Sequence, residues 1–188
     1  MIDINGEKVL VTGGSSMIGS AVIESLQNKG AFVIAPTHEE CDLLVYDDTA
    51  RMIDFHNPKY VVHCAGWNGG IKFNKDYPAS IFFRTATMAL NVLNCCARYN
   101  VDKVVSIISS CAYPDLGNIE LSESNLWNGL PNNTVECHGL SKRILHAYGR
   151  QLSKQYNIKC ISAILTNCYG IGDSFNPDKT KVVGAIIN

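Results

Sequence analysis

Hydrophobic runs alternate with amphipathic stretches along most of the chain. Five short runs rich in Val, Ile, Leu and Cys predict strands that are buried on both faces. The stretches between them carry apolar residues at the spacing of three or four that is typical of helices. The predicted strands are Lys8–Val11, Ala31–Ala35, Tyr60–Cys64, Val104–Ile108 and Cys160–Leu165. The predicted helices are Met17–Lys29, Asp47–His56, Pro78–Tyr99 and His138–Tyr156.

The alternation of strands and helices predicts an α/β fold: a Rossmann-like, doubly wound parallel sheet with helices on both faces. Two long connections, Gly66–Tyr77 and Ser109–Cys137, follow predicted strands at the end where open α/β sheets bind ligands, so we expect both to be functional. We assign residues 1–180 to one nucleotide-binding domain. Residues 181–188 are expected to begin a C-terminal substrate domain that is truncated or absent.

Composition limits the classes of partner. The formal net charge of −1 gives no electrostatic reason to expect nucleic acid or an anionic membrane as a partner. No apolar run approaches the length of a membrane span. The eight cysteines form no CxxC pair and follow no secretion signal, so we expect reduced thiols in a cytoplasmic protein, and no metal site.

A glycine-rich turn joins the first predicted strand to the first predicted helix. Gly13 allows a tight turn there, and Gly19 lets the helix approach the sheet. Ser16 stands in the middle glycine position, where a side chain crowds a phosphate, although its hydroxyl could donate a hydrogen bond. A turn that binds nothing is the alternative, and a dinucleotide is favoured. Its pyrophosphate is expected at Gly13, Ser16, Met17, Ile18 and Gly19.

The end of the second predicted strand bears on the choice of cofactor. An Asp or Glu usually contacts a free ribose hydroxyl at this place, and the strand ends without one. Together with His38 nearby, this absence favours NADP, while the adjacent Glu39 keeps NAD open. The other positions expected to contact the cofactor are Asp42 and Leu43, at the adenine ring, and Ala65 and Gly66.

Three residues carry candidate chemistry. Ser109 follows the fourth predicted strand, and His138 and Lys142 lie four residues apart on one face of a predicted helix. In short-chain dehydrogenases, a Ser, a Tyr and a Lys four residues after the Tyr cooperate in proton and hydride transfer. Here His138 occupies the position of the tyrosine. A hydrolytic nucleophile–histidine pair is not expected, because the sharp nucleophile turn is missing.

Over nearly its whole length, the chain resembles the GDP-L-fucose synthase branch of the extended short-chain dehydrogenase/reductase family. The motifs that carry the resemblance are Thr12-Gly13-Gly14, Gly69-Gly70-Ile71, Tyr77-Pro78, Ser109-Ser110-Cys111-Ala112-Tyr113-Pro114, Glu123–Gly129, Ser141-Lys142 and Thr166-Asn167-Cys168-Tyr169-Gly170. The resemblance implies an NADP-dependent epimerase/reductase that acts on a GDP-linked 4-keto sugar. It also implies a homodimer whose interface is formed by the helices Pro78–Tyr99 and His138–Tyr156.

The same resemblance implies roles for single residues. Ser109 would bond the keto oxygen of the sugar, Cys111 would serve as an acid–base group in epimerisation, and Lys142 would hold the nicotinamide ribose. The substrate would lie against Gly69, Gly70 and Asn167. Cys111 also fits a buried, inert thiol.

Four positions depart from the family pattern. They are His138 for the tyrosine, Ser16 for the middle glycine, Thr85 for a helical asparagine, and Lys181 for the histidine that partners the cysteine. An imidazole titrates near ~6.5, but the cation of Lys142 one turn away disfavours its protonated form. Lys181 fits either a desolvated catalytic amine or a surface lysine. Two hypotheses follow: an active enzyme with altered acid–base groups, or a catalytically silent relative that binds nucleotide or a partner.

Overall fold

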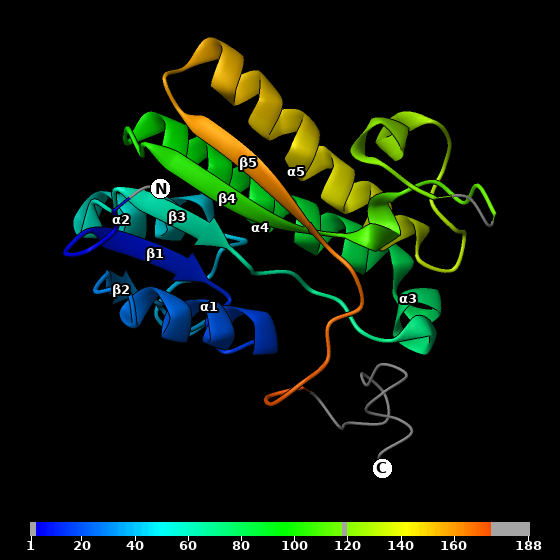
Figure 1. The fold of residues 1–188 in the computed structure, drawn as a ribbon, viewed down its shortest axis with the longest axis horizontal. Coiled ribbons are helices and arrows are strands. Elements are labelled where there is room, and N and C mark those ends of the chain that lie inside the picture. The colour runs from blue at the N-terminus through cyan, green and yellow to red at the C-terminus, as the bar shows by residue number, and fades with distance from the viewer. Residues whose placement is uncertain (1–2, 118–119, 174–188) are drawn as a thin grey trace.

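A computed structural model describes residues 3–117 and 120–173 (Figure 1). The strands are β1 (Lys8–Thr12), β2 (Phe32–Ile34), β3 (Tyr60–His63), β4 (Lys103–Ser109) and β5 (Lys159–Leu165). The helices are α1 (Met17–Gln27), α2 (Tyr46–His56), α3 (Ile71–Asp76), α4 (Pro78–Arg98) and α5 (Glu136–Gln155), with 3₁₀ turns η1 (Ser110–Ala112) and η2 (Glu123–Trp127). All predicted strands and helices are confirmed, with ends that differ by a few residues.

The five strands form one parallel sheet in the order β2-β1-β3-β4-β5. The chain moves outward from β1 to β2, then returns past β1 to β3 and continues to β5. The order therefore reverses between β1 and β3, and ligands bind beyond the carboxyl ends of the strands at such a reversal. This position is where the glycine-rich turn and the first long connection begin.

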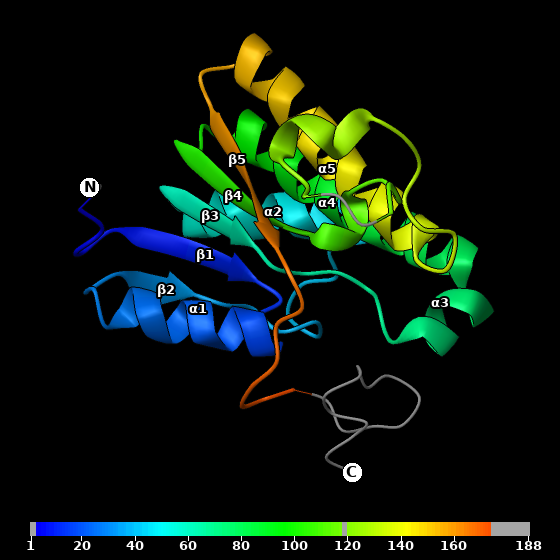
Figure 2. The same ribbon diagram turned by 45° about the vertical axis from the view of Figure 1, so that its right-hand side comes forward.

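Helices cover both faces of the sheet, as predicted. α1 lies on one face, and α2, α4 and α5 lie on the other (Figures 1 and 2). Alternating side chains of β1 show the division, since Leu10 joins the core beneath α2 and α4 while Val9 and Val11 pack toward α1. The larger core lies on the α2–α4–α5 side. Packing against it holds α5 on this face of the sheet, with one end of the helix near the strand ends.

The two long connections contain short helices that the sequence pattern did not reveal. α3 lies within Gly66–Tyr77, and η1 and η2 lie within Ser109–Cys137. A helix of six residues spans too few turns to show a periodicity. The expected C-terminal segment 181–188 lies outside the described residues. Within residues 3–117 and 120–173, no helix is long and apolar enough to cross a membrane.

We predict that Gly19→Ala lowers stability. A β-carbon at this position would overlap the carbonyl oxygen of Gly13 and push α1 from the glycine turn. Because the clash is with backbone, we expect a loss of about 1–3 kcal/mol in the free energy of unfolding, despite the higher helix propensity of alanine. Urea titration followed by circular dichroism measures it. Ser20→Ala, on the exposed side of the same turn, should change stability by less than about 0.5 kcal/mol. Equal stability of the two variants would refute the packing argument.

Candidate functional site

The glycine turn has the geometry of a phosphate loop. Gly13 has a φ of +70°, a left-handed conformation that favours glycine. The Ser16 side chain caps α1: its hydroxyl donates to the Gly13 carbonyl at 2.7 Å and accepts from the Gly19 amide at 3.0 Å. The serine proton considered for a phosphate is therefore already used within the turn. The amides at the start of α1 are left to face a ligand.

The glycine turn lies directly against the chain that leaves β3. A β-carbon on Gly13 would be 2.7 Å from the Ala65 amide nitrogen, and one on Gly14 would be 3.1 Å from the Ala35 β-carbon. Only glycines permit this approach. It brings together the ends of β1, β2 and β3, which supply most of the residues expected to contact the cofactor.

The turn after β2 is rich in carboxylates. Glu40 closes it by accepting a hydrogen bond from the Thr37 amide at 2.7 Å. His38 is largely exposed and lies 3.9 Å from the Asp42 carboxylate. Asn91 of α4 holds the following loop by donating to the carbonyls of Leu43 and Leu44. The Leu43 side chain is buried in the core, so its backbone is the part that can face a ligand.

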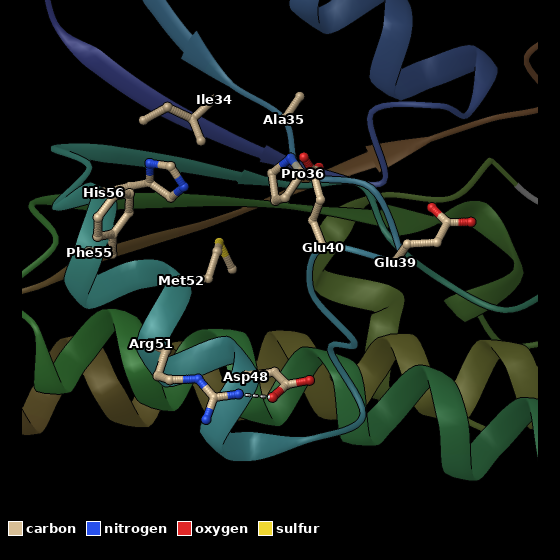
Figure 3. A pocket seen from close by; sticks show the side chains of 10 residues that line it. All are labelled: Ile34, Ala35, Pro36, Glu39, Glu40, Asp48, Arg51, Met52, Phe55 and His56. Atoms are coloured by element: carbon tan, nitrogen blue, oxygen red, sulfur yellow. Dashed lines mark hydrogen bonds and ion pairs between the residues drawn. The ribbon is translucent and has the colours of Figure 1, made fainter.

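A cavity of about 720 Å³ opens beside this turn, between β2 and α2 (Figure 3). Its charged lining includes the carboxylates of Glu39, Glu40 and Asp48, and its arginine, Arg51, is paired with Asp48 at 2.5 Å. None of the expected catalytic residues lines it. The surplus of carboxylates makes it a poor place for a phosphate.

The N-terminal part of α5 packs against the end of β4. Gly139 permits this contact, because a β-carbon there would overlap the Cys111 carbonyl oxygen. Ser109 accepts a hydrogen bond from the Cys111 amide at 3.2 Å, which leaves its hydroxyl proton available to a ligand. His138 is buried, and Ser141 donates to its carbonyl at 2.7 Å. Ser109, Cys111 and His138 are thus gathered at one place.

Lys142 joins this group to the cofactor loops. Its Nζ donates to the Ile107 carbonyl at 3.0 Å, and a β-carbon on Gly66 would be 3.5 Å from the same nitrogen. The side chain is 5% exposed, and burial lowers its pKa from 10.5 to about 8, with Cys64 raising it in part. The ammonium therefore still carries its charge at neutral pH, although burial makes that charge costly.

His63 is a packed core residue at the end of β3. Its Nδ1 lies 2.8 Å from the Thr12 hydroxyl, and its ring is fully buried. Burial first, and the Lys142 cation second, lower its pKa to about 3. The ring is neutral at physiological pH and cannot supply a proton.

The loop with the glycine pair that is expected to contact the substrate is held by side chains of α3 and α4. Thr85 of α4 accepts from the Trp67 amide and donates to the Trp67 carbonyl, both at 3.2 Å. Asn74 of α3 donates to the carbonyls of Gly69 and Gly70. Thr85, which replaces the helical asparagine of the family pattern, therefore holds the start of this loop in place.

Arg143 is a residue that the sequence did not single out. It is 4% exposed, and its Nε and Nη1 donate to the carbonyls of Ala112 and Gly129 at 2.6 and 2.7 Å. Its guanidinium also lies 5.5 Å from the Trp127 ring centre, a cation–π distance. One side chain of α5 thus holds both parts of the connection 109–137. No local pattern marks an arginine with this role.

The remaining expected residues are Asn167 and Lys181. Asn167 follows β5 at the same edge of the sheet but is exposed. Lys181 lies outside the described residues. The arrangement therefore unites the phosphate turn, Gly66, Lys142, Ser109, Cys111 and His138.

Comparison with known proteins gives consistent relatives. A family model, the NAD dependent epimerase/dehydratase family, matches residues 9–188. A GDP-L-fucose synthase of Azorhizobium caulinodans is 34% identical over 182 residues, which cover 97% of this chain and 58% of that protein. A GDP-L-fucose synthase of Dictyostelium discoideum is 30% identical over 183 residues, which cover 96% of this chain and 57% of that protein. The chain therefore spans less than two thirds of these relatives.

Solved structures share the fold. A GDP-6-OMe-4-keto-L-xylo-heptose reductase from C. jejuni superposes with a TM-score of 0.92 at 25% identity, with 99% of this chain covering 53% of that one. A GDP-L-fucose synthetase from Naegleria fowleri bound to NADP gives 0.87 at 26% identity, with 100% of this chain covering 57% of that one. The resemblance found in the sequence and the Rossmann-like fold are both confirmed.

We predict that Lys142→Met stabilises the protein at neutral pH. The folded pKa of Lys142, about 8, lies below the unfolded value of 10.5, so the unfolded chain binds more protons between these pH values. The free energy of unfolding therefore increases as pH rises from about 8 to 10.5, and the destabilising effect of the buried lysine is greatest below pH 8.

Thermal melts of the two proteins between pH 7 and 10.5 measure the effect. The variant should melt several degrees higher at pH 7, and the gap should narrow toward pH 10.5. Titrating groups that do not contact Lys142 are common to both proteins and cancel in the difference. A difference in melting temperature that stays constant between pH 7 and 10.5 would mean that Lys142 does not carry the buried charge.

Proposed function

The chain belongs to the NAD-dependent epimerase/dehydratase family, and from that premise we propose that it forms the nucleotide-binding part of a reductase or epimerase acting on a GDP-linked 4-keto sugar. The observation that carries the proposal is the buried Lys142 cation. Its ammonium lies beside Gly66 of the cofactor loops and on the strand that ends in Ser109. The names of the relatives, GDP-L-fucose synthases and GDP-heptose reductases, support the substrate class.

The glycine turn fits a nicotinamide dinucleotide, because the left-handed Gly13 and its close approach to Ala65 form a tight turn from β1 to the N-terminus of α1, where a pyrophosphate binds. When bound, the cofactor supplies the hydride. Lys142 would hold the nicotinamide ribose through its ammonium. Ser109 would donate a hydrogen bond to the keto oxygen of the sugar and keep its proton, since its own oxygen accepts from the Cys111 amide.

His138 would pass the proton that completes reduction of the keto group. It is buried on the face of α5 that carries Lys142, so a substrate held at Ser109 would lie near both. A neutral imidazole is a weak acid, and the Lys142 cation disfavours its protonated form. We therefore expect slow reduction. For epimerisation we propose Cys111 as one acid–base group and Lys181 as its partner.

We also propose that the protein forms a homodimer through α4 and α5. The two helices pack side by side on one face of the sheet (Figures 1 and 2). On α4, Phe83 is 65% exposed and Leu90 is 37% exposed, one stripe of large apolar side chains turned away from the core. Burial of this stripe against a second copy would remove apolar surface from water.

For the cofactor we propose NADP, with NAD as a competitor and His38 as the residue that decides between them. The solved Naegleria fowleri structure with NADP bound supports the first. The surroundings of His38 support the competitor, because Asp42 lies 3.9 Å from its ring and Glu39 and Glu40 follow it directly. A phosphate on the ribose would meet one imidazole and several carboxylates in this turn.

We predict that His138→Tyr raises turnover. With NADPH and a GDP-linked 4-keto-6-deoxy sugar, a phenol at this position should increase the rate of NADPH oxidation at least about tenfold, since a well-matched proton donor contributes about 10²–10⁴-fold. The loss of absorbance at the NADPH band measures it. His138→Phe has nearly the same size without the hydroxyl and should not raise the rate. Lys142→Ala should abolish turnover in either background.

The oxidation assay, together with thermal melts in the presence of nucleotide, tests the hypothesis of a catalytically silent relative. A nucleotide-binding protein without catalysis would gain thermal stability from NADPH or GDP but would oxidise no cofactor, with or without tyrosine. If neither nucleotide raises the melting temperature, both the enzyme and the nucleotide-binding alternative are wrong.

We predict that His38→Arg shifts cofactor preference. A permanent guanidinium can form charge-assisted hydrogen bonds with a ribose phosphate, so the ratio of NADPH to NADH affinity should rise about tenfold. Fluorescence titration of both reduced cofactors measures the two affinities without any turnover. His38→Gln, which has no charge at any pH, should move the ratio the other way or leave it unchanged. An arginine variant with the wild-type ratio would show that residue 38 does not face the ribose.

A further inference from the structure

Asn74 is a buried polar residue on α3 that no part of the proposed chemistry uses. Only 3% of it is exposed, and it lies between the loop that follows β3 and the start of α5. We infer that Asn74 is a positioning residue: it holds the loop Asn68–Gly70 against the first turn of α5, so that the loop expected to face the sugar and the helix expected to supply the proton keep one relative position.

The side-chain amide nitrogen of Asn74 contacts three consecutive residues of the loop. Its Nδ2 lies 3.0 Å from the Asn68 side-chain oxygen, 3.1 Å from the Gly69 carbonyl and 3.0 Å from the Gly70 carbonyl. All three neighbours are acceptors, which sets the orientation of the amide. Two glycines in succession have high conformational freedom and lose much entropy on ordering. A side chain that bonds both carbonyls is a direct way to order them.

The amide oxygen of Asn74 faces α5. The Cys137 thiol lies 3.5 Å from Oδ1 and is its hydrogen-bond donor. Burial raises the pKa of Cys137, so the thiol keeps its proton and remains a donor at physiological pH. Cys137 directly precedes His138 in the first turn of α5. Asn74 therefore connects the glycine loop to the residue beside the expected proton donor.

The role of this connection in binding the sugar rests on the proposed function, whereas the connection itself does not. The closing experiment uses Asn74→Asp, which keeps the size of the side chain but turns a carboxylate oxygen toward three acceptors. Asn74→Ser is the second variant, which loses most of the bonds without adding charge. Asn91→Asp is the matched control, because Asn91 holds the loop of Leu43 and Leu44 by the same kind of amide contact.

Two readouts need no catalysis. Amide hydrogen exchange of residues 66–70 should become at least about tenfold faster in both Asn74 variants, the size expected for loss of net hydrogen-bond energy. Alkylation of Cys137, followed by mass spectrometry, should accelerate by a similar factor. Asn91→Asp should leave both unchanged and instead speed exchange at residues 43–44. Unchanged exchange at 66–70 and an unchanged thiol in Asn74→Asp and Asn74→Ser would overturn the inference, as would faster exchange spread evenly over the chain.

A kinetic readout then separates the inference from the proposed function. With a GDP-linked 4-keto sugar and NADPH, Asn74→Asp should raise KM for the sugar about tenfold or more and change KM for NADPH less than twofold. Asn91→Asp should show the opposite split. A wild type without turnover would refute the proposed function, and the exchange and alkylation results would still decide whether Asn74 holds the loop. A KM for NADPH that rises as much as KM for the sugar would overturn the sugar-loop role.

Discussion

The burial of one cation, the Lys142 ammonium, is the constraint on which the site depends. A charge removed from water must be met by hydrogen bonds or it destabilises the fold. Lys142 obtains one from the Ile107 carbonyl, and burial still lowers its pKa to about 8. To place that nitrogen on β4, α5 must lie close to the strand end, where Gly139 lets it pack against the Cys111 carbonyl. The positions of Ser109, Cys111 and His138 follow from the same placement of α5.

Glycines make these approaches possible at three junctions. Gly19 lets α1 meet the turn at Gly13, Gly13 lets that turn meet Ala65, and Gly139 lets α5 meet the Cys111 carbonyl. The last two junctions join segments that are distant in the sequence, and all three lie near the carboxyl ends of the strands. The polar side chains Arg143, Asn74 and Thr85 then bind backbone carbonyls of the loops between them. Close packing at the glycines and a few buried polar contacts together order these loops.

The sequence was sufficient for the sheet and insufficient for the loops, for a physical reason. A strand buried on both faces and a helix of several turns each produce a repeating pattern of apolar residues, so β1–β5 and the long helices could be predicted. The six residues of α3 produce none. The grouping of His138 with Lys142 was predictable from their spacing along α5, and the place of Ser109 from its position at the end of β4. The contacts of Arg143 and Asn74 were not, because each joins segments more than ten residues apart and depends on tertiary placement. Ser16 shows the converse, since its cap to α1 consumes the hydroxyl that the sequence offered to a phosphate.

The energetics of Lys142 bear on whether the protein is an enzyme or a silent relative. A buried ammonium that keeps its proton at neutral pH reduces stability, and a protein with only a structural role would be more stable with an apolar side chain of similar shape. The cost is offset when a ligand brings hydrogen-bond acceptors or negative charge to the nitrogen. Gly66, which follows β3 in the loops expected to contact the cofactor, adjoins the nitrogen, since a β-carbon there would be 3.5 Å from it. The retained cation therefore favours a site that binds a nucleotide, whereas the rate of the chemistry depends on the altered acid–base groups, of which His138 lies on the same helix as Lys142.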